Sequence, residues 1–223
     1  MTIAALCLIL SCCGDNPDIS INTNNTMSGT LADYTDGTVD SLKCFSYNHL
    51  IGSCAVSRDG KFSITLPATG GIRIGKINNI TVSDTNAIVS SPIYTVGIKN
   101  GIQKGVLYKS NITTSSNTGT GSLKIVFCYS DRDLTIKGTN NVSTTESIIW
   151  DVALKKGWNE IAMETLSTQS LLYSTTIPNG LSWRLFPNWN NVYTKDWLHL
   201  NSWVKINIKY KACDFIRVCI GSE

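Results

Sequence analysis

The sequence has few of the residues that most often carry chemistry. It contains two histidines, His49 and His199, and its eight cysteines include no Cys-x-x-Cys pair, so a zinc site is not expected. It also lacks the sequence motifs of nucleophile elbows, phosphate-binding loops and metalloprotease helices. We therefore expect a protein that is not an enzyme, with no catalytic residues, no metal and no cofactor.

Charge is also scarce. Asp, Glu, Lys and Arg make up 16% of the chain, and the net charge is +3, which is too little for the basic footprint of a nucleic-acid-binding protein. The main basic cluster, Lys205–Lys211, alternates lysines with apolar residues, which is typical of the solvent face of a strand. We therefore expect no nucleic-acid partner.

Acidic residues gather visibly at one point, where Asp131 and Asp133 flank Arg132. A calcium ion takes about six to eight oxygen ligands, so two carboxylates fall well short of a calcium site. We expect a turn between two strands at this point, with both carboxylates in solvent.

A membrane-spanning helix needs about 20 apolar residues, and the N-terminal apolar run Ile3–Leu10 is much shorter. Ser11, Cys12 and Cys13 follow it directly. A short apolar run that ends in a small residue and a cysteine resembles a bacterial lipoprotein signal peptide. The positive charge that usually opens such a signal is missing here, and a buried N-terminal strand is the alternative interpretation.

The resemblance implies that residues 1–11 are a signal peptide and that Cys12, or alternatively Cys13, becomes the lipidated first residue. The polar residues 12–18 would then form a tether. Several acyl chains hold a protein firmly on a membrane, so the membrane is the first expected partner. The expected location is the bacterial cell envelope, at the outer membrane, facing the periplasm or the cell surface.

Apolar residues alternate with polar ones along much of the chain, which is typical of strands with one buried face. The clearest runs are Phe62–Leu66, Leu123–Tyr129, Ile148–Leu154, Leu181–Leu185 and Val204–Tyr210. Turn dipeptides such as Asp59-Gly60 and Lys156-Gly157 separate them. Many short strands between turns predict an all-β fold of the β-sandwich type.

A stretch rich in Gly, Ser, Thr and Asn covers residues 110–121 and reads as a linker or a long loop. It divides the chain into an N-terminal β-sandwich unit at 19–109 and a second β unit at 122–187, which we expect to pack together. A single sandwich with one long loop is the alternative. Residues 188–223 change in character, and we expect a C-terminal extension of uncertain structure.

Two stretches, Gly29–Tyr34 and Asp59–Pro67, resemble the immunoglobulin-like or transthyretin-like sandwiches of exported bacterial proteins. Two further stretches, Asp133–Thr139 and Leu154–Asn159, are similar to uncharacterised bacterial lipoproteins that pair such a sandwich with more strands. The resemblance implies architecture, and it brings no catalytic residues with it.

Exported proteins can form disulfides. Cys44 and Cys54 flank an expected turn around His49–Gly52, which makes them candidates for a disulfide across a hairpin. Cys128 lies in an apolar run, and we expect it to be a small buried hydrophobic residue.

Aromatic residues are concentrated in one segment. Trp183, Trp189, Tyr193, Trp197 and Trp203 fall within 21 positions. Trp183 belongs to an alternating run and is expected in the core, as Trp150 is. Exposed aromatic rings form flat apolar platforms, so Trp189, Tyr193 and Trp197 are the candidate ligand-binding residues.

These observations predict a lipid-anchored protein of the bacterial cell envelope that acts as a non-catalytic binding or adhesion module. Its ligand would be a glycan or a protein. The alternative is a structural or assembly subunit of an envelope complex, whose exposed strand edges pair with a partner strand.

Overall fold

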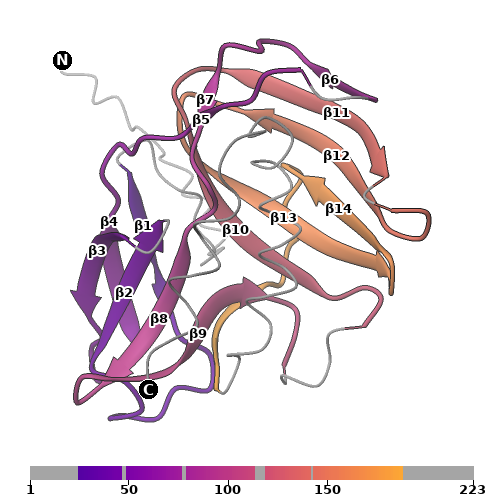
Figure 1. The fold of residues 1–223 in the computed structure, drawn as a ribbon. Coiled ribbons are helices and arrows are strands. Elements are labelled where there is room, and N and C mark those ends of the chain that lie inside the picture. Colours follow the sequence, from indigo (N-terminus) through magenta and orange to yellow (C-terminus); the bar gives the residue numbers. More distant parts are fainter. Residues whose placement is uncertain (1–24, 47–48, 77–78, 114–118, 142, 188–223) are drawn as a thin grey trace, which may run out of the picture.

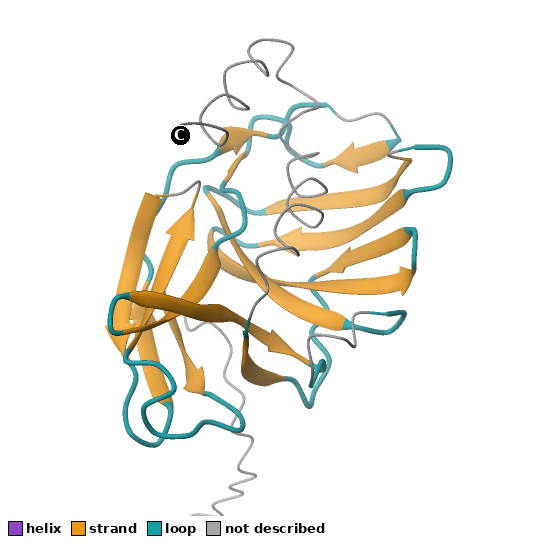
Figure 2. Cartoon of the chain, turned by 60° about the horizontal axis from the view of Figure 1, so that its bottom comes forward, coloured by secondary structure: helices purple, strands orange, loops and turns teal. Residues whose placement is uncertain are grey.

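The computed structural model describes residues 25–46, 49–76, 79–113, 119–141 and 143–187. Every regular element in this part of the chain is a strand, and none is a helix (Figures 1 and 2). The prediction of an all-β fold is therefore confirmed. The strands are β1 (Thr26–Thr30), β2 (Ser41–Ser46), β3 (His49–Ala55), β4 (Lys61–Thr65), β5 (Ile72–Arg73), β6 (Ile80–Val82), β7 (Ile88–Val89), β8 (Tyr94–Lys99), β9 (Ile102–Ser110), β10 (Leu123–Ser130), β11 (Leu134–Asn141), β12 (Ser147–Leu154), β13 (Gly157–Ser167), β14 (Ser170–Ser174) and β15 (Ser182–Phe186).

The strands form two sheets of very different size. Strands β1 and β4 make a two-stranded antiparallel sheet, and the other strands make a 13-stranded sheet that follows the order β3-β2-β8-β9-β10-β13-β14-β12-β11-β6. Off this path, β15 pairs with β9, and β7 pairs with β5 and β10. Apolar residues of the small sheet pack against those of β2, β9 and β10 in one core, in the manner of a β-sandwich.

Strands β10 and β13 separate two hydrophobic cores. On β10, Ile125 and Phe127 belong to the first core, whereas Val126 and Cys128 belong to the second. The same division holds on β13. A strand that is buried on both faces carries a nearly continuous apolar run, which explains why β10 is apolar beyond the one face that its alternation predicts.

The first core is centred on Trp183 of β15. Its ring stacks on Phe127, with centroids 5.8 Å apart, and meets Phe62 edge-on at 5.2 Å. Gly29 of β1 makes room for this ring, because a Cβ atom there would lie 2.3 Å from Trp183 Cδ1. Trp183 is buried, as its alternating run predicts.

The second core lies beneath β10–β14 and is centred on a second aromatic stack. Trp150 of β12 stacks on Tyr173 of β14 with centroids 4.5 Å apart, and both side chains are buried. The two strands run parallel and pair directly through these residues. Trp150 therefore lies in the core, as predicted.

The two ranges expected as separate units exchange strands. Strand β6, from the range 19–109, pairs with β11, and β15, from the range 122–187, pairs with β9. Between the two ranges, β9 and β10 pair as antiparallel neighbours. The described ends of the stretch 110–121 are also fixed in place, because Asn111 Nδ2 donates to the Gly121 carbonyl and Asn111 Oδ1 accepts from the Leu123 amide.

Both predicted turn dipeptides join consecutive strands, but in neither case do these strands pair. Asp59-Gly60 lies between β3 and β4, and β4 crosses to pair with β1. Lys156-Gly157 connects β12 to β13, and β14 is inserted between these two strands. The turns follow from local sequence, whereas the strand partners follow from distant packing.

The β2–β3 hairpin does not place the predicted disulfide partners opposite each other. The register sets Cys44 opposite Gly52 and Cys54 opposite Leu42, so the two cysteines are diagonal neighbours, and both are free thiols. Diagonal Cα atoms lie about 7–8 Å apart, beyond the usual reach of a disulfide. Burial raises the pKa of Cys44 to about 12, which disfavours its thiolate.

Cys128 matches its prediction as a buried hydrophobic residue. It belongs to the second core, and its thiol donates to the Ser90 carbonyl at 3.3 Å. Burial raises the pKa of this thiol to about 12.

Candidate functional site

A pocket of about 410 Å³ lies where the end of β15 meets the loop that follows β1. Its volume falls within the range of about 300–1,000 Å³ that is typical of small-molecule sites. Three separate segments of the chain contribute to its wall. The lining residues are Leu31, Ala32, Asp33, Tyr34, Thr38, Lys104, Thr113, Arg184, Leu185, Phe186 and Pro187.

Strand β15 is seated by a pair of facing glycines. Gly97 of β8 and Gly105 of β9 are directly opposite in the ladder. A Cβ atom on Gly97 would lie 2.7 Å from Leu185 Cδ1, and one on Gly105 would lie 2.5 Å from the Phe186 carbonyl oxygen. The absence of side chains at both positions therefore lets β15 approach β8 and β9 closely. This close approach fixes where Arg184, a residue of β15, lies in the pocket wall.

The opposite wall is the loop between β1 and β2. The Ala32 amide donates to the Trp183 carbonyl at 2.7 Å, which ties the start of the loop to β15. Farther along, the Tyr34 hydroxyl donates to the Val39 carbonyl at 3.1 Å. The Thr38 hydroxyl donates to the Thr35 carbonyl at 2.6 Å. The Ala32 bond holds the loop against β15 and the other two bonds hold the shape of the loop, so the pocket has defined walls on both sides.

An ion pair links the two walls. Arg184 donates from Nη1 to Asp33 Oδ2, and Asp33 takes a left-handed backbone conformation with φ of 55°. The Arg184 side chain is 21% exposed and the Asp33 side chain is 78% exposed, so the cation lies deeper than the anion. Lys104 is a second, exposed cation in the lining.

The arrangement suits binding. The half-buried Tyr34 and Leu185 and the exposed Pro187 supply apolar wall, while Arg184 and Lys104 supply hydrogen-bond donors. Small-molecule sites commonly combine apolar walls with a few placed polar groups in this way. Asp33 is the one carboxylate among the described residues that line the pocket, and it is held by Arg184.

Sequence reasoning did not find this pocket. Its residues come from positions 31–38, 104–113 and 184–187, and no short motif joins them. The stretch Gly29–Tyr34 predicts architecture alone. The pair Gly97 and Gly105 was a partial signal, because glycines inside strands often mark a close approach of another backbone.

The structure does not describe the sequence-predicted ligand and anchor residues. Cys12 and Cys13, and the aromatic residues Trp189, Tyr193 and Trp197, fall outside the described residues. Pro187, which lines the pocket, is the last described residue before that aromatic segment.

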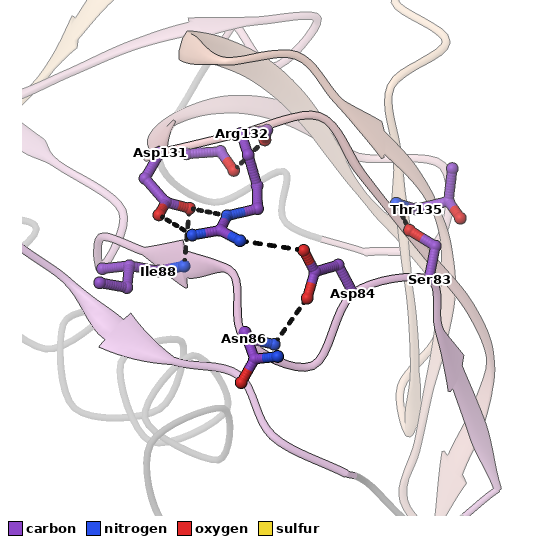
Figure 3. A network of polar contacts seen from close by, with 8 residues as sticks. Ser83, Asp84, Asn86, Ile88, Asp131, Arg132 and Thr135 are labelled. Atoms are coloured by element: carbon purple, nitrogen blue, oxygen red, sulfur yellow. Dashed lines mark hydrogen bonds and ion pairs between the residues drawn. The ribbon is translucent and has the colours of Figure 1, made fainter.

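Asp131, Arg132 and Asp133 form the turn between β10 and β11, as predicted. The expectation that both carboxylates are in solvent only is wrong, because both have protein partners, and Figure 3 shows those of Asp131. Arg132 donates to both Asp131 oxygens, at 3.1 and 2.8 Å, and to Asp84 Oδ2 at 3.1 Å. These hydrogen bonds with Arg132 are the main reason that the pKa of Asp131 is lowered. Asp133 instead accepts from Lys155 Nζ and the Lys156 amide, which caps the β12–β13 turn.

No group of three or more His, Cys, Asp or Glu side chains is placed to hold a metal ion in the part of the chain that the structure describes. Among the same residues, no helix has the length and apolar character to cross a membrane.

Comparison with known proteins adds no relative. No protein-family model, no curated protein and no solved structure matches this chain. The resemblance to bacterial lipoproteins with immunoglobulin-like or transthyretin-like units therefore stays a prediction. The pocket is the structural feature that bears on function.

Proposed function

We propose that this chain is a non-catalytic binding module of the bacterial cell envelope, anchored through a lipid on Cys12 and binding a glycan or protein ligand. The observation that supports binding most strongly is the pocket between β15 and the β1–β2 loop, in which apolar walls surround a partly buried arginine. Loops on a rigid β scaffold commonly carry such sites. The N-terminal sequence Ile3–Cys13 supports the anchor.

Filling the pocket tests the binding function. Thr38 is an exposed lining residue, so Thr38→Trp places a large ring in the pocket and removes only the hydrogen bond from the Thr38 hydroxyl to the Thr35 carbonyl. On an array of neutral and acidic glycans and of envelope and host proteins, the full chain in detergent micelles is expected to bind a defined ligand. Thr38→Trp is expected to weaken that binding about tenfold or more, because the indole ring occupies the space where the ligand would contact the pocket wall.

A matched control is Thr139→Trp, which adds the same ring at an exposed threonine of β11 and is expected to bind as the wild type does. Equal binding by Thr38→Trp and the wild type would show that the ligand binds outside this pocket. Binding of no ligand by the wild-type chain would count against the module.

The anchor is tested separately. Cys12→Ser removes the thiol that would receive the lipid, and we expect this variant to leave the membrane fraction of bacterial cells and to lose the acyl mass detected by mass spectrometry. Cys13→Ser is the matched control and is expected to remain lipidated. If Cys12→Ser keeps the lipid and Cys13→Ser loses it, the lipidated residue is Cys13. If neither the wild type nor the variants carry a lipid, the proposed anchor is refuted.

A further inference from the structure

The charges that line the pocket select among ligand classes. Lys104 and Arg184 carry two positive charges and Asp33 one negative charge, so the lining has a net charge of 2 − 1 = +1. This balance favours an anionic ligand over a neutral one, and the Asp33 carboxylate repels further negative charge beside Arg184.

The guanidinium of Arg184 keeps donor groups that a planar anion can use. Its Nη1 is engaged by Asp33, and Nε and Nη2 have no other hydrogen bond within the described part of the chain. Arginine binds carboxylates through two parallel N–H groups. At 21% exposure the group is also partly removed from water, which strengthens a charge-assisted hydrogen bond.

The remaining walls suit a ligand that is apolar on its faces and polar around its edge. Leu185 is half-buried and Pro187 is exposed, so both present apolar surface to the pocket. The Tyr34 ring and the Thr38 hydroxyl complete the rim. A pyranose ring presents C–H groups on its faces and hydroxyl groups around its edge, so it matches both kinds of wall.

We propose that the pocket binds a small carboxylated saccharide of the hexuronic acid type, with the carboxylate on Arg184 and the ring against Tyr34, Leu185 and Pro187. This proposal rests on the proposed binding function and assigns its ligand class. Asp33 acts as a positioning residue, because it holds the Arg184 guanidinium across the pocket. Lys104, being exposed, adds attraction that salt weakens.

The experiment compares D-glucuronate with D-glucose, which has the same ring but carries CH₂OH in place of the carboxylate. Titration calorimetry on the full chain in detergent micelles at low salt is expected to show glucuronate binding about tenfold tighter than glucose, the scale of one charge-assisted bond. Glucose 6-phosphate, which carries a phosphate group, is expected to bind more weakly than glucuronate.

Two variants test whether the preference for glucuronate over glucose depends on Arg184 and Lys104. Arg184→Gln is expected to abolish the preference for glucuronate over glucose, and Lys104→Gln is expected to reduce it while making it less sensitive to salt. Lys137→Gln, at an exposed lysine on β11, is the matched control and is expected to keep the wild-type preference. Circular dichroism on each variant establishes that it is folded.

The outcomes separate the two proposals. If glucose and glucuronate bind equally and Thr38→Trp blocks both, the pocket is a binding site and the acidic class is wrong. If glucose 6-phosphate binds most tightly, the ligand is a phosphorylated sugar and the assignment of a carboxylated ligand is wrong. If no saccharide binds while another array ligand depends on Thr38, the saccharide class is overturned and the binding function stands.

Discussion

Trp183→Ala is expected to lower the free energy of unfolding by about 3–5 kcal/mol, the usual cost of removing a large buried aromatic side chain. The ring is 7% exposed and contacts Phe127 on its face and Phe62 at its edge. These two partners come from β10 and β4, so the loss affects the contact between the large and the small sheet. Urea unfolding followed by circular dichroism measures the change.

Trp183→Phe is the matched control, because a phenyl ring keeps the stack on Phe127 and leaves a smaller cavity. We expect it to lose clearly less stability than the alanine variant. A cost below about 1 kcal/mol for Trp183→Ala, the ordinary effect of a substitution outside a core, would show that the first core is not built around this ring.

Gly105→Ala is expected to lower the free energy of unfolding by about 1–3 kcal/mol through overpacking and to weaken ligand binding in the pocket. The added Cβ would lie 2.5 Å from the Phe186 carbonyl oxygen and 3.2 Å from Leu185 Cγ. The carbonyl belongs to the backbone of β15 and cannot rotate away as a side chain can. Strand β15 must therefore shift, and Arg184 shifts with it.

The control for this variant is Gly70→Ala, since a Cβ atom on Gly70 would meet nothing within 4 Å. We expect its stability and ligand binding to equal those of the wild type. Thermal unfolding and titration of the same samples separate the two effects of Gly105→Ala. Unchanged stability for Gly105→Ala would mean that β15 is not seated on β9 as the structure shows.

The strands themselves could be predicted from the sequence because their signal is local. Alternation placed β4, β10, β12 and β15 within a residue or two of their observed bounds. Trp150 and Trp183 were expected in the core for the same reason, since each shares a face with apolar neighbours in its own strand.

Strand partners could not be predicted in this way. The insertion of β14 between β12 and β13, and the return of β15 to β9, depend on which distant apolar faces complete the two cores. The cysteine pair shows the same limit at short range, because a register shift after Cys44 decides what lies opposite it.

The pocket is the feature farthest from the reach of sequence reasoning. Asp33 and Arg184 are 151 positions apart in the chain, and neither stands in a motif that indicates a ligand site. Their contact requires β15 to lie between β9 and the end of β1, which in turn depends on two glycines that face each other in the ladder. The aromatic residues at 189–197 are visible in composition, whereas the pocket depends on tertiary structure.

The most direct test of the account observes Arg184 itself while ligand is added. Nuclear magnetic resonance on the full chain labelled with ¹⁵N-arginine follows each guanidinium Nε–H signal, and the Arg184→Lys variant identifies the signal of Arg184. On titration with glucuronate and, in parallel, with glucose, the account predicts a saturable shift of the Arg184 signal while that of Arg132, held by Asp84 and Asp131, stays in place. Saturable binding of either sugar that leaves the Arg184 signal unchanged would contradict the assignment of this pocket as the binding site.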